Sequence, residues 1–273
     1  MIAFSDRQNA QRMRRPVEVG GVIFHKSEWI DRGAAEGVTP TVFMVEQPPD
    51  SLLVPHFHRE NQYQLFVEGG GTIGRSPLSP VTVHYAGAYT GYGPLLSGPD
   101  GVKYFTIRAA FDTGALTLDE SRAEMARGPK RHATSNAIDL SSADDLRSRK
   151  QLAREAVIAP QDGMGAILFR LPPNARLPVE SLGPSVGQFV FVLNGAVKAP
   201  HATLHAWDNF FVPDGEPCEL AATAAGAEVV ALHVPPRDAA YAEALTGVQA
   251  HLRRTGGHPS APPSASAAAA VAR

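Results

Sequence analysis

The chain has 273 residues and a formal net charge of -2, and it is 44% hydrophobic and 19% charged. This length and balance exclude a mostly disordered chain and allow one large or two ordinary folded domains. The near-neutral charge provides no broad basic surface, so we expect no nucleic-acid partner. The 25 glycines and 23 prolines favour many short elements joined by turns, as in β structure.

The chain shows no sign of export or membrane insertion. Cys218 is the single cysteine, so no internal disulfide can form. No signal peptide is evident at the start, and no apolar run approaches the ~20 residues of a membrane span. We therefore expect a cytoplasmic protein with no membrane partner. Residues 256–273 are small and lack aromatics, which predicts a disordered tail.

In chain order, the first predicted elements are strands. Val42–Val45 leads into a Pro-Pro turn, and Asn61–Gly69 (NQYQLFVEG) places an apolar run before a turn glycine. Gly101–Arg108 (GVKYFTIR) predicts another strand. The following residues are more polar, and Ser142–Val157 begins with Ser and Asp and spaces its leucines as on a helix. This predicts a linker with one short helix.

The strand pattern then recurs in the same order. Arg170–Asn174 (RLPPN) repeats the Pro-Pro turn, Gly187–Gly195 (GQFVFVLNG) repeats Asn61–Gly69, and Gly226–His233 (GAEVVALH) repeats Gly101–Arg108. A second short helix is expected over Tyr241–Arg254. The repeat predicts an all-β chain of two tandem barrels. We place the N-terminal barrel at residues 1–115, the linker at 116–160 and the C-terminal barrel at 161–255.

Pro55–Gln64 (PHFHRENQYQ) holds the densest group of potential ligands. Because strand side chains alternate, an extended conformation would place five polar side chains on one face. Two imidazoles and an oxygen donor suit a divalent ion, which would offset the cost of burying this face. The alternative is an edge strand with the same face in water. The five side chains are His56, His58, Glu60, Gln62 and Gln64.

Pro55–Gly69 resembles the first signature of the cupin superfamily, which runs His-x-His, three or four residues, Glu, an apolar strand and a glycine. With the repeat, the chain resembles a bicupin, which implies two tandem double-stranded β-helix (jelly-roll) barrels. In that family the two histidines and the glutamate bind a metal. The resemblance therefore assigns His56 and His58 as ligands, while Gln62 stands at the glutamate position and Glu60 is close enough to substitute.

The second cupin signature ends in a histidine, whereas this chain has Leu95 at that point of YTGYGPL. His84 is the nearest alternative ligand. In the second repeat, Pro178–Gly187 contains no histidine and the later signature ends in Cys218. We therefore expect a degenerate C-terminal barrel that binds no metal.

Three functions follow from these observations. The resemblance implies a metal-dependent enzyme, with a dioxygenase as the leading reaction, Fe(II), Mn, Ni or Zn as cofactor and a small oxygen-bearing substrate. The second hypothesis is a non-catalytic small-molecule-binding or structural bicupin with a decayed site. The third is a metal-free isomerase or cyclase with His56 or His58 as general base. Candidate substrate contacts, which could equally fill the barrel, are Tyr89, Tyr92 and Tyr104.

A homodimer is a further hypothesis. It is based on the barrel edges and on the apolar strand Phe189–Leu193, because exposed β-edges are usually paired or covered.

Overall fold

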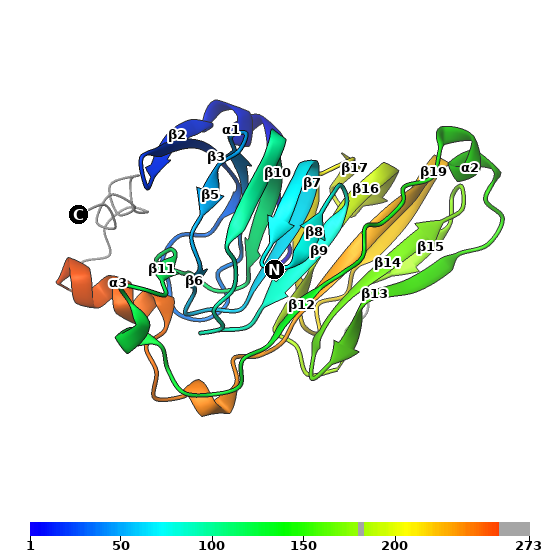
Figure 1. Cartoon of the computed structure of the whole chain (residues 1–273). Coiled ribbons are helices and arrows are strands. Elements are labelled where there is room, and N and C mark those ends of the chain that lie inside the picture. Colours follow the sequence, from blue (N-terminus) through cyan, green and yellow to red (C-terminus); the bar gives the residue numbers. More distant parts are fainter. Residues whose placement is uncertain (180–182, 257–273) are drawn as a thin grey trace. The chain divides into compact units, whose positions relative to one another are not determined.

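The computed structural model describes residues 1–179 and 183–256, which form two compact units of antiparallel strands (Figure 1). Among the described residues, the N-terminal barrel comprises Arg7–Ala137 together with residues 237–256. The C-terminal barrel comprises Met1–Asp6 and Ile138–Pro236. Each barrel is thus completed by a segment from the opposite end of the chain. Within the described residues, no helix is both long and apolar enough to cross a membrane.

The N-terminal barrel is built on one large sheet with the strand order β12-β9-β7-β10-β4-β3-β2. These strands are β2 (Arg15–Val19), β3 (Val22–Asp31), β4 (Thr41–Gln47), β7 (Gln62–Ile73), β9 (Thr82–Ala86), β10 (Leu95–Arg108) and β12 (His132–Thr134). Two short strands also join this sheet, β5 (Leu52–Leu53) beside β10 and β8 (Ser76–Leu78) beside β7. A separate two-stranded sheet pairs β6 (His56–Phe57) with β11 (Leu116–Thr117). Its helices are α1 (Arg7–Arg12), η1 (Arg122–Glu124), η2 (Ala239–Tyr241) and α3 (Gly247–Thr255).

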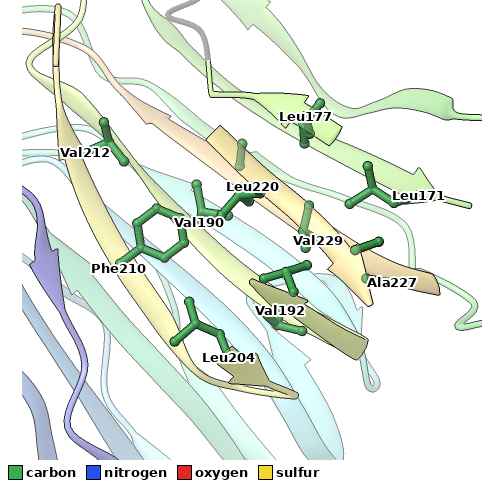
Figure 2. Packing of buried hydrophobic residues seen from close by; sticks show 13 residues of the cluster. Leu171, Leu177, Val190, Val192, Leu204, Phe210, Val212, Leu220, Ala227 and Val229 are labelled. Atoms are coloured by element: carbon green, nitrogen blue, oxygen red, sulfur yellow. The ribbon is translucent and has the colours of Figure 1, made fainter. Parts of the chain in front are cut away.

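The C-terminal barrel has the strand order β1-β18-β16-β19-β14-β13. The strands are β1 (Ala3–Phe4), β13 (Ala153–Gln161), β14 (Met164–Leu171), β15 (Arg176–Pro178), β16 (Gly187–Ala199), β17 (Ala202–His205), β18 (Asn209–Pro213) and β19 (Glu219–Val234), with α2 (Ala143–Ser148) ahead of them. Alternate residues of β16, β18 and β19 pack into one apolar core, which includes Val190, Val192, Phe210 and Val229 (Figure 2). Apolar side chains therefore fill this part of the inner face of the barrel.

The repeat seen in the sequence has a steric cause. A Cβ on Gly69 would lie 2.1 Å from the carbonyl oxygen of Gly101, and one on Gly195 would lie 2.3 Å from that of Gly226. All four glycines also have positive φ. The same close approach of two neighbouring strands thus recurs in both barrels, and only glycine fits there. The expected all-β fold of two tandem barrels is confirmed.

Several sequence expectations change in detail. The linker helix ends at Ser148, and Ala153–Gln161 forms β13 instead of a second helical turn. Ser142 caps the helix by accepting from the Asp145 N–H. Phe189–Leu193 lies inside β16 between β18 and β19, so it presents no free edge for a dimer. The expected disordered tail, apart from Gly256, lies outside the described residues.

The segment after Pro236 belongs with the N-terminal barrel because it is bonded there. The Tyr89 hydroxyl donates to the Leu245 carbonyl at 2.6 Å, and the Tyr241 hydroxyl donates to that of Pro129 at 2.6 Å. In Figure 1, α3 lies beside β6 and β11. The expected range of 161–255 for the C-terminal barrel therefore includes a stretch that packs elsewhere.

Candidate functional site

The chain bends at Arg59 and Glu60, between β6 and β7, and this bend divides the five polar side chains. Glu60 Oε1 accepts from the backbone N–H of Gly247 at 2.8 Å and from Arg237 Nη1 at 3.1 Å. Burial raises the pKa of Glu60 to about 7, although Gly247 and Arg237 oppose the shift. The period-two prediction was wrong here: Glu60 is engaged by the C-terminal segment and is not hydrogen-bonded to the histidines.

His56 is held with its Nε2 toward the barrel interior. Its Nδ1 lies 2.8 Å from the Val54 carbonyl oxygen, and its Nε2 lies 2.9 Å from the Tyr92 hydroxyl. A carbonyl can only accept, so Nδ1 carries the proton and Nε2 accepts from Tyr92. Burial, reinforced by His58, lowers the pKa of His56 to about 3, so the ring is neutral at pH 7.

His58 is oriented by Asp112, a residue that the sequence did not single out. Asp112 Oδ1 lies 2.9 Å from His58 Nδ1, and the backbone N–H groups of Arg59 and Gly114 also donate to this carboxylate. Burial would raise the pKa of Asp112, but Arg108 and His58 outweigh burial and lower it. An ionised carboxylate only accepts, so His58 donates from Nδ1 and keeps a lone pair on Nε2. Burial, with Arg108, lowers the pKa of His58.

Arg108, the last residue of β10, places a guanidinium among these side chains. Its Nε donates to Gln62 Oε1 at 2.9 Å, and its Nη2 lies 3.3 Å from His58 Nε2. Gln62 in turn donates to the Tyr92 hydroxyl at 2.6 Å. The result is a closed buried network in which a neutral amide holds a cation beside the imidazole of His58.

The inner face of the barrel opens toward solvent at β3. Lys26 Nζ lies 3.8 Å from the centre of the Phe43 ring and 3.2 Å from Glu28 Oε1, which also accepts from Arg15 at 2.8 Å. The side chains of Lys26 and Glu28 are 29% and 18% exposed, against 6% for Arg108. With Asp112 included, this face carries three cations and two carboxylates, which leaves one net positive charge.

A second row of polar side chains lies on the same inner face, two residues further along β7. Gln64 pairs with His84 across β7 and β9, and His84 Nδ1 lies 2.8 Å from the Thr134 hydroxyl. Burial lowers the pKa of His84 to about 3. Within the described residues, His84 Nε2 and Gln64 Oε1 are buried without a hydrogen-bond partner.

The three candidate tyrosines lie in different surroundings. Tyr92 bonds His56 and Gln62, as described. Tyr104 packs in an apolar cluster that includes Leu95, and its ring centre lies 5.1 Å from that of Phe66. Tyr89 packs with Tyr241 of the C-terminal segment. The Tyr92 hydroxyl therefore bonds side chains of the predicted ligands, whereas Tyr89 bonds His58 only through its backbone N–H, at 2.7 Å from the His58 carbonyl oxygen.

No protein-family model matches this sequence, and no curated protein matches it. Solved structures do match. A Nostoc punctiforme protein named provisionally as a dioxygenase has 13% identity and a TM-score of 0.59, covering 86% of this chain and 83% of its own. The oxalate decarboxylase of Lactobacillus farciminis has 10% identity and a TM-score of 0.57, covering 86% of each chain. The chain has a tandem cupin fold. A bacterial pirin from Escherichia coli, solved with nickel(II), has 12% identity and a TM-score of 0.51, covering 86% of this chain and all of its own.

The cupin barrel offers an incomplete set of metal ligands. His56 and His58 both direct Nε2 inward with Nδ1 tied to an acceptor, which is how metal-binding histidines are usually held. However, Gln62 Oε1 is occupied by Arg108, and Glu60 is held by the C-terminal segment. Among residues 1–179 and 183–256, no three His, Cys, Asp or Glu side chains are grouped to hold an ion. With a guanidinium beside His58, these residues do not fit a divalent cation.

Two of the residues that matter here were missed in the sequence. Arg108 and Asp112 lie about 50 positions after His58, and only the pairing of β10 with β7 brings Arg108 opposite Gln62. The available signal was alternation: Tyr104, Thr106 and Arg108 share one face of β10, so a charged residue ends an inward-facing row.

Proposed function

We propose that the N-terminal cupin barrel is a metal-independent acid-base enzyme for a small carboxylate-bearing substrate. The observation that carries the proposal is the position of Arg108, whose Nη2 lies beside the His58 ring, 3.2 Å from Nδ1 and 3.3 Å from Nε2, while Asp112 holds Nδ1. A fixed cation beside an oriented neutral imidazole can bind an anion and place it against a base.

In this proposal each side chain has one role. His58 Nε2 removes a proton from a carbon next to a carbonyl group, and Asp112 stabilises the imidazolium that forms. The electron pair moves to the carbonyl oxygen, where the Arg108 guanidinium stabilises the negative charge. Return of a proton from His58 to the same carbon, planar in the intermediate, gives back the substrate or its epimer at that carbon, so no oxidant or co-reactant is consumed. Lys26, 29% exposed, attracts the anion at the open side of the face.

The metal-dependent enzyme is the second candidate, and a specific observation favours it. Both His56 and His58 have Nδ1 bound to an acceptor, so each ring keeps its lone pair on Nε2, which in His56 accepts from the Tyr92 hydroxyl. The Escherichia coli pirin was solved with nickel(II), and the Nostoc punctiforme protein is named provisionally as a dioxygenase. The neutral amide of Gln62 and the guanidinium of Arg108 argue against a metal-dependent enzyme.

One experiment separates the two candidates. Protein purified without a metal-affinity tag is analysed for bound metal and then incubated in D2O with EDTA and a panel of 2-oxo acids, with deuterium incorporation followed by NMR. We expect incorporation into at least one acid that survives EDTA and is lost in His58→Gln but retained in the exposed control His205→Gln. Stoichiometric metal that disappears in His56→Ala/His58→Ala, with no EDTA-resistant exchange, would favour the metal-dependent enzyme instead.

A further inference from the structure

One row of inward-facing side chains, at paired positions on three neighbouring strands, can be compared between the two barrels. In the N-terminal barrel, Gln64 pairs with His84 on one side and with Thr106 on the other. In the C-terminal barrel, Val190 pairs in the same way with Phe210 and with Ala231. Both rows are equally buried: Val190, Phe210 and Ala231 are 1%, 0% and 4% exposed, and Gln64, His84 and Thr106 are 2%, 3% and 4% exposed.

The fold therefore does not require a polar row at this position. The C-terminal barrel fills it with apolar side chains of similar burial, which is the more stable choice. In the N-terminal barrel, by contrast, His84 Nε2 and Gln64 Oε1 are buried without a partner among the described residues. Each such atom has lost its hydrogen bonds to water on burial without gaining one in the protein, which destabilises the folded state. A cost of this kind in a native barrel is explained if a ligand supplies the missing hydrogen bonds.

The chemistry of the two atoms points to a hydroxyl group. Gln64 Oε1 can only accept, so the ligand must donate to it. If the Thr134 hydroxyl donates to His84 Nδ1, then His84 Nε2–H is a donor, and one ligand hydroxyl can accept from it while donating to Gln64. In the opposite tautomer both atoms accept, and two neighbouring hydroxyls are needed. A hydroxyl group fits both arrangements, because it can donate to Gln64 and can also accept from His84.

The spacing connects this row to the carboxylate site. Gln62 and Gln64 are two residues apart on one strand, so their side chains are separated by about 7 Å along the sheet. Gln62 holds Arg108, and Gln64 faces His84. The next row is apolar, with Phe66 against Tyr104. A ligand of a few carbons could therefore place its carboxylate at Arg108 and a hydroxyl at the second row.

We infer that Gln64 and His84 form a subsite for a hydroxyl group of a small hydroxy acid, whose carboxylate is bound by Arg108. This inference rests on the proposed function and names its substrate class. It goes beyond the acid-base chemistry of His58 because Gln64 and His84 take no part in proton transfer.

The test uses pairs of acids that differ in hydroxyl groups: malate with succinate, glycerate with propionate and gluconate with hexanoate. Affinities are measured by calorimetry for the full chain, for Gln64→Val/His84→Phe, which copies the C-terminal barrel, and for Arg108→Gln. We expect the native chain to bind at least one hydroxy acid more than 10-fold tighter than its partner. In the double variant this ratio should fall below threefold while the deoxy acid binds as before, and the melting temperature without ligand should rise.

The outcomes separate the inference from the function on which it rests. A native chain that binds both members of every pair equally, or a double variant that keeps the native preference, overturns the hydroxyl subsite and leaves the carboxylate site standing. Failure of all the acids to bind, or binding that is unchanged in Arg108→Gln, overturns the carboxylate site and the subsite with it. Because the double variant removes unpaired polar atoms, a loss of folding is not expected. The single variant Gln64→Val provides a second measurement of the preference for hydroxy acids.

Discussion

Replacing Arg108 by Met and Gln62 by Glu should convert the N-terminal barrel into a metal-binding barrel. A divalent ion about 2.1 Å from His58 Nε2 would lie roughly 4 Å from the guanidinium of Arg108. At an effective dielectric constant of about 20, the repulsion between these charges is ~8 kcal/mol, or about six orders of magnitude in affinity. Some of this is relieved if Arg108 swings away, so we take a 100-fold gain in nickel(II) affinity as the threshold.

The assay is calorimetric titration with nickel(II) and manganese(II), checked by metal content after gel filtration. Gln62→Glu alone is the matched control, because its carboxylate would pair with Arg108 and leave the repulsion in place. A second control adds His56→Ala and His58→Ala to the double variant and should abolish binding. If the native chain already binds nickel(II) as tightly as the double variant, the view that Arg108 excludes a metal is refuted.

Three further predictions concern stability. Gly247→Ala should lower the free energy of unfolding by about 1–3 kcal/mol, because its Cβ would lie 2.7 Å from the Asp112 Cα. In the folded protein His84 has a pKa of about 3 and stays neutral, whereas in the unfolded chain it takes up a proton as the pH falls below its ordinary pKa. The free energy of unfolding should therefore fall by about 2 kcal/mol between pH 7 and pH 5 because of His84. His84→Phe should remove this contribution to the pH dependence. Glu228→Gln should cost about 1–3 kcal/mol at pH 7, since the carboxylate accepts two hydrogen bonds from Ser141.

Urea unfolding measures all three, and each has its own control. Gly87→Ala has only ordinary contacts, the nearest at 3.5 Å, and should be nearly neutral. The exposed His205→Gln should leave the difference between pH 7 and pH 5 as it is in the native chain. Burial alone would raise the pKa of Glu228, but hydrogen bonds from Ser141, Asn194 and Arg170 outweigh burial and lower it. The contribution of Glu228 to stability is therefore present at pH 7 and is lost as the pH falls through its pKa in the folded state. A Glu228→Gln variant as stable as the native chain at pH 7 would contradict this account.

Local pattern explains why the fold and part of the site could be predicted. Alternation and the recurring glycines, such as Gly69 and Gly195, are properties of neighbouring residues, and they identified the strands and both barrels. His56 was placed on the inner face by the same reasoning. Glu60 was misplaced because it lies in a two-residue bend that interrupts the strand, and its partner Gly247 lies 187 positions away. Contacts of that range depend on how the chain returns to a barrel, which no local pattern specifies.

The exchange of chain ends between the barrels has a consequence during synthesis. Asp112 leaves the ribosome long before Gly247, whose N–H bonds Glu60 and whose backbone packs against Asp112. At 5–20 residues per second, roughly 7–27 s separate the two residues. The barrel that is translated first is therefore the one whose site is completed last, only after every strand of the other barrel has been made. A nascent chain released before Gly247 would leave the Glu60 carboxylate without that partner.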